Sequence, residues 1–104
     1  MRTTILWSQR ARRDLLEIGD FIAHDKPGAA ARLVSRITDM IERVVHFPAA
    51  GRVVPEVGRD DIREVILDKY RIVYRLRDNE ITVLTVFRSH RLFVEPDFDD
   101  QAAE

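Results

Sequence analysis

The chain has no cysteine among its 104 residues, so neither a disulfide nor a thiolate metal site can form. This absence fits a reducing cytoplasm, which is where we expect the protein to work. Glycine and proline number only four each, and no apolar run approaches the roughly 20 residues needed to cross a bilayer. The N-terminal segment holds no long apolar stretch, so we predict neither a signal peptide nor a membrane partner.

Several kinds of functional motif are also missing. The sequence has no glycine-rich phosphate loop, no nucleophile elbow and no pair of histidines at metal-binding spacing. We therefore expect no cofactor and no metal ion. A chain of this length forms one domain, and its 45% content of hydrophobic residues predicts a folded core.

Charge is distributed unevenly along the chain. The net charge is −1, but residues 95–104 contain five acidic and no basic side chains, so the preceding 94 residues carry a net charge of +4. We predict one domain over residues 1–94, followed by an acidic, flexible tail. Fifteen of the 17 basic residues are arginine, whose planar fork pairs with phosphate or carboxylate at two points. The alternative explanation for this excess is codon bias in a GC-rich genome, without any role in ligand binding.

The first half of the chain predicts a short strand and two helices. Residues 3–7 are β-prone, and Ser8 is a suitable cap for a helix over residues 8–24. A second helix is predicted over residues 27–47, between two prolines. Apolar residues recur at helical spacing in both segments: Ala11, Leu15, Ile18 and Ile22, then Ala30, Leu33, Val34, Ile37, Ile41 and Val44.

The second half predicts a loop and three strands. After a loop rich in proline and glycine, strands are expected at residues 62–67, 70–77 and 81–88, separated by short turns. The resulting order is β-α-α-β-β-β. This order predicts an α+β fold, with a helical hairpin packed on one face of a mainly antiparallel four-stranded sheet.

Four segments, taken in order, resemble the RelE/ParE superfamily of bacterial toxins. They are residues 7–15 (WSQRARRDL), residues 46–52 (HFPAAGR), residues 62–75, which contain IRE and YRIVYR, and residues 83–91 (VLTVFRSHR). The resemblance covers residues 4–93. It implies the plasmid-stabilisation toxin of a type II toxin–antitoxin system, held inactive by a cognate antitoxin protein. The superfamily includes both inhibitors of DNA gyrase and nucleases that cut mRNA on the ribosome.

One branch of the superfamily supplies candidate catalytic residues. RNA cleavage without a metal needs a base, a cation that stabilises the phosphorane, and an acid. In YoeB-like toxins a loop glutamate, a strand arginine and a histidine after the last strand fill these roles, and Glu56, Arg71 and His90 match them in position. The residue after that histidine is a tyrosine in YoeB-like toxins, whereas here it is Arg91. The loop lysines of the RelE branch are absent as well.

The same residues also have structural interpretations. Arg71, Arg75 and Arg88 are predicted to contribute to one basic face that binds a target, but arginines on a strand are commonly a solvated sheet face. His90 is equally consistent with capping or packing, and Glu56 with a surface ion pair. Tyr70 and Tyr74 share a strand face with apolar residues, so we expect them in the core.

The incomplete nuclease set favours a non-enzymatic inhibitor of DNA gyrase, similar to ParE. The alternatives are a RelE- or YoeB-like endoribonuclease that acts on mRNA at the ribosome, and a small binding domain without toxicity. For the antitoxin we expect an apolar and acidic segment. It would dock in the groove between the helices as a helix, or along an outer strand by β-addition.

Overall fold

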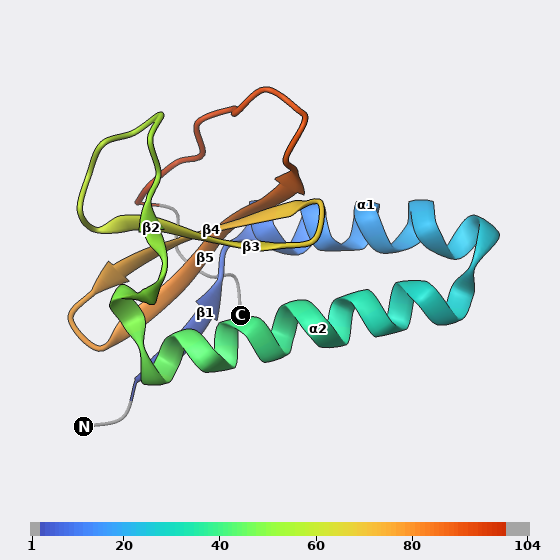
Figure 1. Ribbon diagram of the computed structural model, residues 1–104, viewed down its shortest axis with the longest axis horizontal. Coiled ribbons are helices and arrows are strands. Elements are labelled where there is room, and N and C mark those ends of the chain that lie inside the picture. Colours follow the sequence, from blue (N-terminus) through green and yellow to red (C-terminus); the bar gives the residue numbers. More distant parts are fainter. Residues whose placement is uncertain (1–2, 100–104) are drawn as a thin grey trace.

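Two helices cover one face of a five-stranded sheet in the computed structural model, which describes residues 3–99 (Figure 1). The helices are α1 (Gln9–Asp25) and α2 (Pro27–His46), and they form an antiparallel hairpin. Figure 1 shows that the connected ends of the two helices project past the sheet. The predicted α+β order and helical hairpin are confirmed.

The strands follow the order β1-β5-β4-β3-β2 across the sheet. Only β1 and β5 are parallel, and the other neighbours are antiparallel. The three long strands lie within one residue of their predicted positions, whereas β2 was not predicted. The bounds are β1 Thr4–Trp7, β2 Arg52–Val53, β3 Ile62–Leu67, β4 Tyr70–Arg77 and β5 Glu80–Arg88.

Local side-chain chemistry fixes where the helices begin. The Ser8 hydroxyl accepts a hydrogen bond from the Ala11 N–H at 3.0 Å and donates one to the Leu84 carbonyl at 3.1 Å. This cap therefore starts α1 and also ties it to β5. Pro27 lies in the first turn of α2, where its missing N–H costs no hydrogen bond.

The sheet is buried on both faces. One core lies between the helices and the sheet, and includes Ile37 and Ile41 from α2 with Ile72 and Val83 from the sheet. The opposite face carries a smaller cluster of Val54, Ile62, Val73 and Leu84. The loop between β2 and β3 and the segment that follows β5 supply side chains to this second cluster: Val57, Phe93 and Phe98.

The segment after β5 therefore differs from the tail that the sequence predicted. From the sequence, residues 95–104 are expected to form an acidic, flexible tail. Phe98 instead packs on the second core, Pro96 is buried, and Asp99 pairs with Arg77 at 3.3 Å. Residues 100–104 of the predicted tail lie outside the described part of the chain.

Candidate functional site

Arg71, on β4, lies at the centre of a cluster on the sheet face opposite the helices. Its Nε donates to the Glu64 carboxylate at 2.5 Å, and its two terminal nitrogens donate to both oxygens of Glu56 at 2.8 Å. The guanidinium also lies over the rings of Phe87 and Phe93, at 5.1 and 5.7 Å from their centroids. Only 9% of the Arg71 side chain is exposed. The two carboxylates therefore bind the N–H groups of the guanidinium, and the two aromatic rings cover its planar surface.

The charges of this cluster are strongly coupled. The hydrogen bonds from Arg71 lower the pKa of the Glu56 carboxyl to about 2, and the bonds to Glu56 raise the pKa of Arg71 further above its usual range. Glu64, whose side chain is fully buried, also accepts a hydrogen bond from the half-exposed Arg52 at 2.6 Å. The cluster contains three ion pairs, Arg52–Glu64, Arg71–Glu64 and Arg71–Glu56, so Arg71 and Glu64 each have two partners.

The structure brings together only part of the predicted catalytic set. Glu56 and Arg71 are in direct contact, as described above. His90 lies exposed in the turn after β5, and no hydrogen bond or ion pair within residues 3–99 links it to them. Arg91 is also exposed and lines a different hollow.

The predicted basic face is divided between the two sides of the sheet. Arg71 and Arg75 share the face opposite the helices, as expected, but both are buried and covered. Arg88 lies on the helix side, where it lines a hollow of about 210 Å³ with Arg91, Tyr70 and residues of α1. Arg71 and Arg75 lie beneath the loop that carries Glu56 and the segment that carries Phe98, so these two arginines do not form an open surface.

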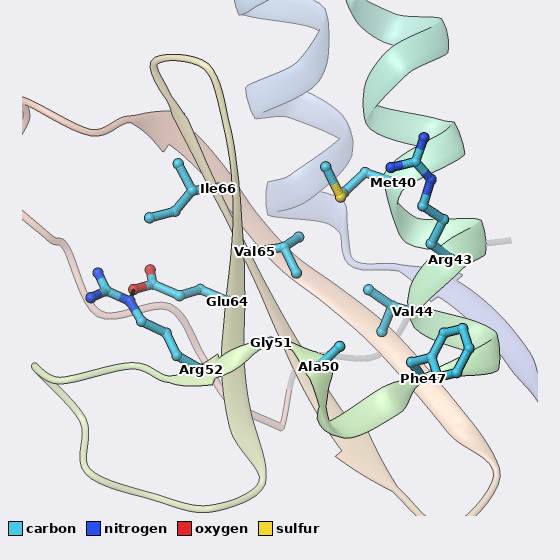
Figure 2. Close-up of a pocket in the computed structure, with 10 residues that line it drawn as sticks. All are labelled: Met40, Arg43, Val44, Phe47, Ala50, Gly51, Arg52, Glu64, Val65 and Ile66. Atoms are coloured by element: carbon cyan, nitrogen blue, oxygen red, sulfur yellow. Dashed lines mark hydrogen bonds and ion pairs between the residues drawn. The ribbon is translucent and has the colours of Figure 1, made fainter.

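A second hollow, of about 500 Å³, lies between α2 and the edge of the sheet at β3 (Figure 2). Figure 2 shows Val65 pointing toward α2, whereas Glu64 and Ile66 lie on the other side of the strand. Exposed apolar side chains flank the hollow, with Phe47 69% and Ile66 50% exposed. Its lining is Met40, Arg43, Val44, Phe47, Ala50, Gly51, Arg52, Glu64, Val65 and Ile66.

The edge of β3 is unpaired along part of this hollow. Ile62 accepts a backbone hydrogen bond from Val54, so its polar groups face the β2 side. Alternate residues of an antiparallel strand face the same edge, and Ile66 is four positions further along. The pairing of β2 with β3 ends at Glu64, so no strand within residues 3–99 pairs with β3 at Ile66. This stretch offers backbone donors and acceptors beside an apolar hollow.

Sequence reasoning missed Glu64, Phe87 and Phe93, which hold Arg71 in place. Glu64 follows Arg63 on β3, and two adjacent charged residues in a strand by themselves suggest contact with solvent. The sequence did contain one indication, because a carboxylate on one strand of a hairpin lies within reach of a cation on the next strand, as Glu64 and Arg71 do. The two phenylalanines carried no comparable signal.

The described residues form no cluster of three or more His, Asp or Glu side chains that could hold a metal ion. No helix within residues 3–99 is long and apolar enough to cross a membrane. The described residues therefore form an ion-pair cluster on one sheet face, an apolar hollow beside an unpaired strand edge, and a small hollow near α1 that is lined by two arginines and two acidic residues.

Comparison with known proteins places the chain among toxins. The family model described as the ParE toxin of the type II toxin–antitoxin system parDE matches residues 5–93. A protein named "Putative toxin Y4kP" from Sinorhizobium fredii is 40% identical over 93 residues, which cover 86% of this chain and 92% of that protein. "Toxin RelE2" from Caulobacter vibrioides is 27% identical over 88 residues, which cover 85% of this chain and 97% of that protein.

A solved structure supports the same relationship. A chain of the chromosomal ParDE toxin–antitoxin system from P. aeruginosa matches with a TM-score of 0.67 and 25% identity, over 83% of this chain and 95% of that chain. The resemblance predicted from the sequence is thus confirmed at the level of the family. The chain belongs to the ParE toxin family of type II toxin–antitoxin systems.

Proposed function

We propose that this toxin arrests growth by binding a protein target and that it does not cleave RNA. The favoured target is DNA gyrase. The observation that carries the proposal is the state of Arg71. An arginine that stabilises a phosphorane must direct its donors at the phosphate, whereas Arg71 directs three of them at Glu56 and Glu64. A substrate phosphate would have to displace a carboxylate from a nearly buried site.

The other nuclease candidates support the same conclusion. A general base works best when its pKa is near the operating pH, and the Glu56 carboxyl, with a pKa of about 2, is a weak base at neutrality. His90 is exposed and makes no contact with Glu56 or Arg71 among the described residues. The three residues therefore do not surround a common substrate position as a general base, a phosphate-binding cation and a general acid.

One observation favours the nuclease alternative at a different place. Arg88, Arg91 and Tyr70 line the same hollow near the end of β5, a short distance along the chain from His90. The Nε of Arg88 is buried and has no hydrogen-bond partner in the described part of the chain. Two guanidinium groups and a phenol are suitable donors for an RNA phosphate, although Asp14 and Glu17 line the same hollow and would repel it.

One experiment separates the two candidates. The toxin is expressed alone under tight induction, and growth, mRNA 5′ ends and gyrase-dependent DNA cleavage are followed together. Growth arrest with DNA breaks and intact mRNA supports the gyrase proposal. Cut mRNA supports the nuclease alternative, and absence of growth arrest supports a non-toxic binding domain.

Two variants make this experiment sharper. His90→Ala is expected to remain toxic, because the proposed inhibitor does not use His90 as an acid. The double variant Arg88→Gln/Arg91→Gln would abolish mRNA cleavage if the hollow near α1 were a nuclease site. Arg12→Gln/Arg13→Gln, on the exposed side of α1, is its charge-matched control.

For the cognate antitoxin, we propose the hollow beside β3 as a docking site. An extended segment placed there gains backbone hydrogen bonds at Ile66 and apolar contacts with Phe47, while Arg43 and Arg52 attract its acidic residues. The groove between the helices was the other expected site. The hollow on that side is also apolar, but it lies beside helices whose backbone groups are already paired.

A further inference from the structure

The segment formed by residues 93–99, called the strap below, lies across the sheet face opposite the helices. After β5 the chain turns and runs back over this face toward the loop between β2 and β3 (Figure 1). Phe93 packs edge-on against Phe87 with 5.8 Å between ring centroids, and Phe98 packs on the second core. The family match ends at residue 93, so most of the strap lies outside the region shared with the family.

Arg75 lies beneath the strap without a carboxylate partner. It is only 4% exposed, and its terminal nitrogens donate to the Phe98 carbonyl and to the Thr82 hydroxyl. Its Nε is buried and has no hydrogen-bond partner. None of the ion pairs within residues 3–99 involves Arg75. A buried cation that binds only neutral acceptors is costly, because carbonyl and hydroxyl oxygens replace its hydration incompletely.

The surroundings of Arg75 define a site with three parts. Arg59 lies over the Phe98 ring at 5.2 Å from its centroid, above a floor formed by the second core. Arg77 pairs with Asp99 at 3.3 Å at the exposed rim, where the Asp99 side chain is 80% exposed. The site thus accepts an aromatic ring, offers a buried guanidinium beside that ring, and carries a second cation at its edge.

We propose that the strap is an internal ligand that occupies a binding site for an acidic, aromatic peptide segment of a partner protein. The strap supplies the ring but gives Arg75 only a neutral carbonyl. A partner segment whose aromatic residue is accompanied by a carboxylate in place of that carbonyl would make a charge-assisted hydrogen bond, which is roughly twice as strong as a neutral one. The strap competes through its high effective concentration, since it is part of the same chain.

This arrangement selects among partners. A purely apolar segment gains nothing over the strap and does not displace it, whereas a segment with a well-placed carboxylate does. The site lies on the opposite sheet face from the helix hairpin, and the proposal is independent of whether the toxin acts on gyrase or on RNA. Its test measures binding and not growth, so the two proposals fail separately.

The test uses full-length protein and a synthetic peptide with the sequence of residues 92–98. With a free C-terminus, this peptide presents a carboxylate at the position of the Phe98 carbonyl, and its amidated form presents a neutral group. Two variants loosen the strap: Phe98→Ser removes its ring, and Asp99→Lys makes it repel Arg77. Binding is followed by NMR titration of ¹⁵N-labelled protein, with circular dichroism as a check on folding.

We expect both variants to bind the free-acid peptide at least about tenfold more tightly than the wild type, because their own strap competes less. The amidated peptide should bind roughly five- to tenfold more weakly than the free acid. Adding Arg75→Gln to either variant should remove this preference, whereas Arg13→Gln, an equal charge change on the exposed side of α1, should not.

Three results would overturn the proposal. They are equal binding by wild type and variants, equal binding of the free-acid and amidated peptides, and tighter binding of a single-stranded RNA oligonucleotide than of the peptide at the same strap-covered residues. If Phe98→Ser fails to fold, Asp99→Lys decides the question alone, because its substitution is at an exposed side chain.

Discussion

The Nε of Arg71 donates to Oε1 of Glu64 at 2.5 Å, which joins a guanidinium that is 9% exposed to a carboxylate that is fully buried. Burial removes most of the water from both groups, so each needs the other as a hydrogen-bond and charge partner. The contact links β3 to β4 on the face away from the helices, and Glu56 and Arg52 complete the charge balance from the loop and from β2. We interpret this cluster as the polar core of that sheet face.

Removing Arg71 should therefore destabilise the protein more than an ordinary surface change. Arg71→Ala leaves Glu64 buried with only Arg52 as a partner, and breaking a buried pair in this way costs roughly 3–5 kcal/mol. Arg71→Met combined with Glu64→Leu removes both charges and should recover most of that loss. Urea unfolding of the three proteins measures the difference. Equal stability of Arg71→Ala and wild type would contradict the structural role.

Acid should weaken the same cluster through Glu56. Its pKa in the folded protein is lowered to about 2 from an ordinary value of 4.5, so the folded state holds the charged form more strongly than the unfolded chain does. The resulting stabilisation is complete above about pH 5 and is lost as the pH falls from 4.5 toward 2. Because the Glu56 side chain is 40% exposed, we expect a contribution on the order of 1 kcal/mol.

This dependence is measured by unfolding wild type and Glu56→Gln in urea at a series of pH values between 6 and 2. The wild type should lose its advantage over the variant within that window, while Arg71 stays protonated throughout. A constant difference between the two proteins across the series would mean that Glu56 is not held in its charged form by Arg71.

Gly51 should tolerate no larger residue while Tyr74 is present. A Cβ built at Gly51 would lie 2.1 Å from the Tyr74 hydroxyl oxygen and 2.8 Å from the Glu64 carbonyl oxygen. The hydroxyl is fixed there, because it donates to the Pro48 carbonyl at 3.0 Å. We expect Gly51→Ala to cost about 1–3 kcal/mol, as other forced overpacking does.

A double-mutant cycle with Tyr74→Phe tests the cause of that cost. Removing the hydroxyl opens part of the space, so Gly51→Ala should be less destabilising in the Tyr74→Phe protein than in the wild type. Thermal unfolding of the four proteins gives the coupling energy. Full additivity would show that the clash is with the β3 backbone and not with the tyrosine.

The helices and long strands were predictable because local signals mark them. Ser8 and Pro27 identify helix starts, and the short turns at Asp68 and Asp78, both at positive φ, separate the last three strands. The short strand β2 carries no periodicity in its two residues, and it exists through its pairing with Glu64 and Arg63 on β3. Pattern reading had no means of finding it.

The environment of the arginines was not predictable for a related reason. On β4, alternating tyrosine and isoleucine correctly indicate the core face, and the arginines between them match an exposed face equally well. Their burial depends on segments distant in sequence, namely the loop that carries Glu56 and the strap that carries Phe98. Whether a cation is solvated or covered depends on the tertiary structure, so the sequence of one strand cannot predict it.

The antitoxin has two expected docking sites on this toxin, and single substitutions distinguish them. Ile66→Asp places a carboxylate at the free edge of β3, where it repels an acidic segment and removes an apolar contact. We expect it to weaken antitoxin binding by at least about tenfold, which corresponds to about 1.4 kcal/mol. Leu16→Asp, at the hollow beside the helices, should have little effect. Ser35→Asp, at an exposed position of α2, controls for the added charge.

Calorimetric titration of each variant with the protein encoded next to this toxin measures the three affinities, and unfolding curves confirm that each variant is folded. Raising the salt concentration should weaken wild-type binding, since part of the attraction comes from Arg43 and Arg52 at the hollow. A loss of affinity in Leu16→Asp with none in Ile66→Asp would assign the antitoxin to the helix side. The β-addition model would then be wrong, because its central contact at Ile66 would contribute nothing to the affinity.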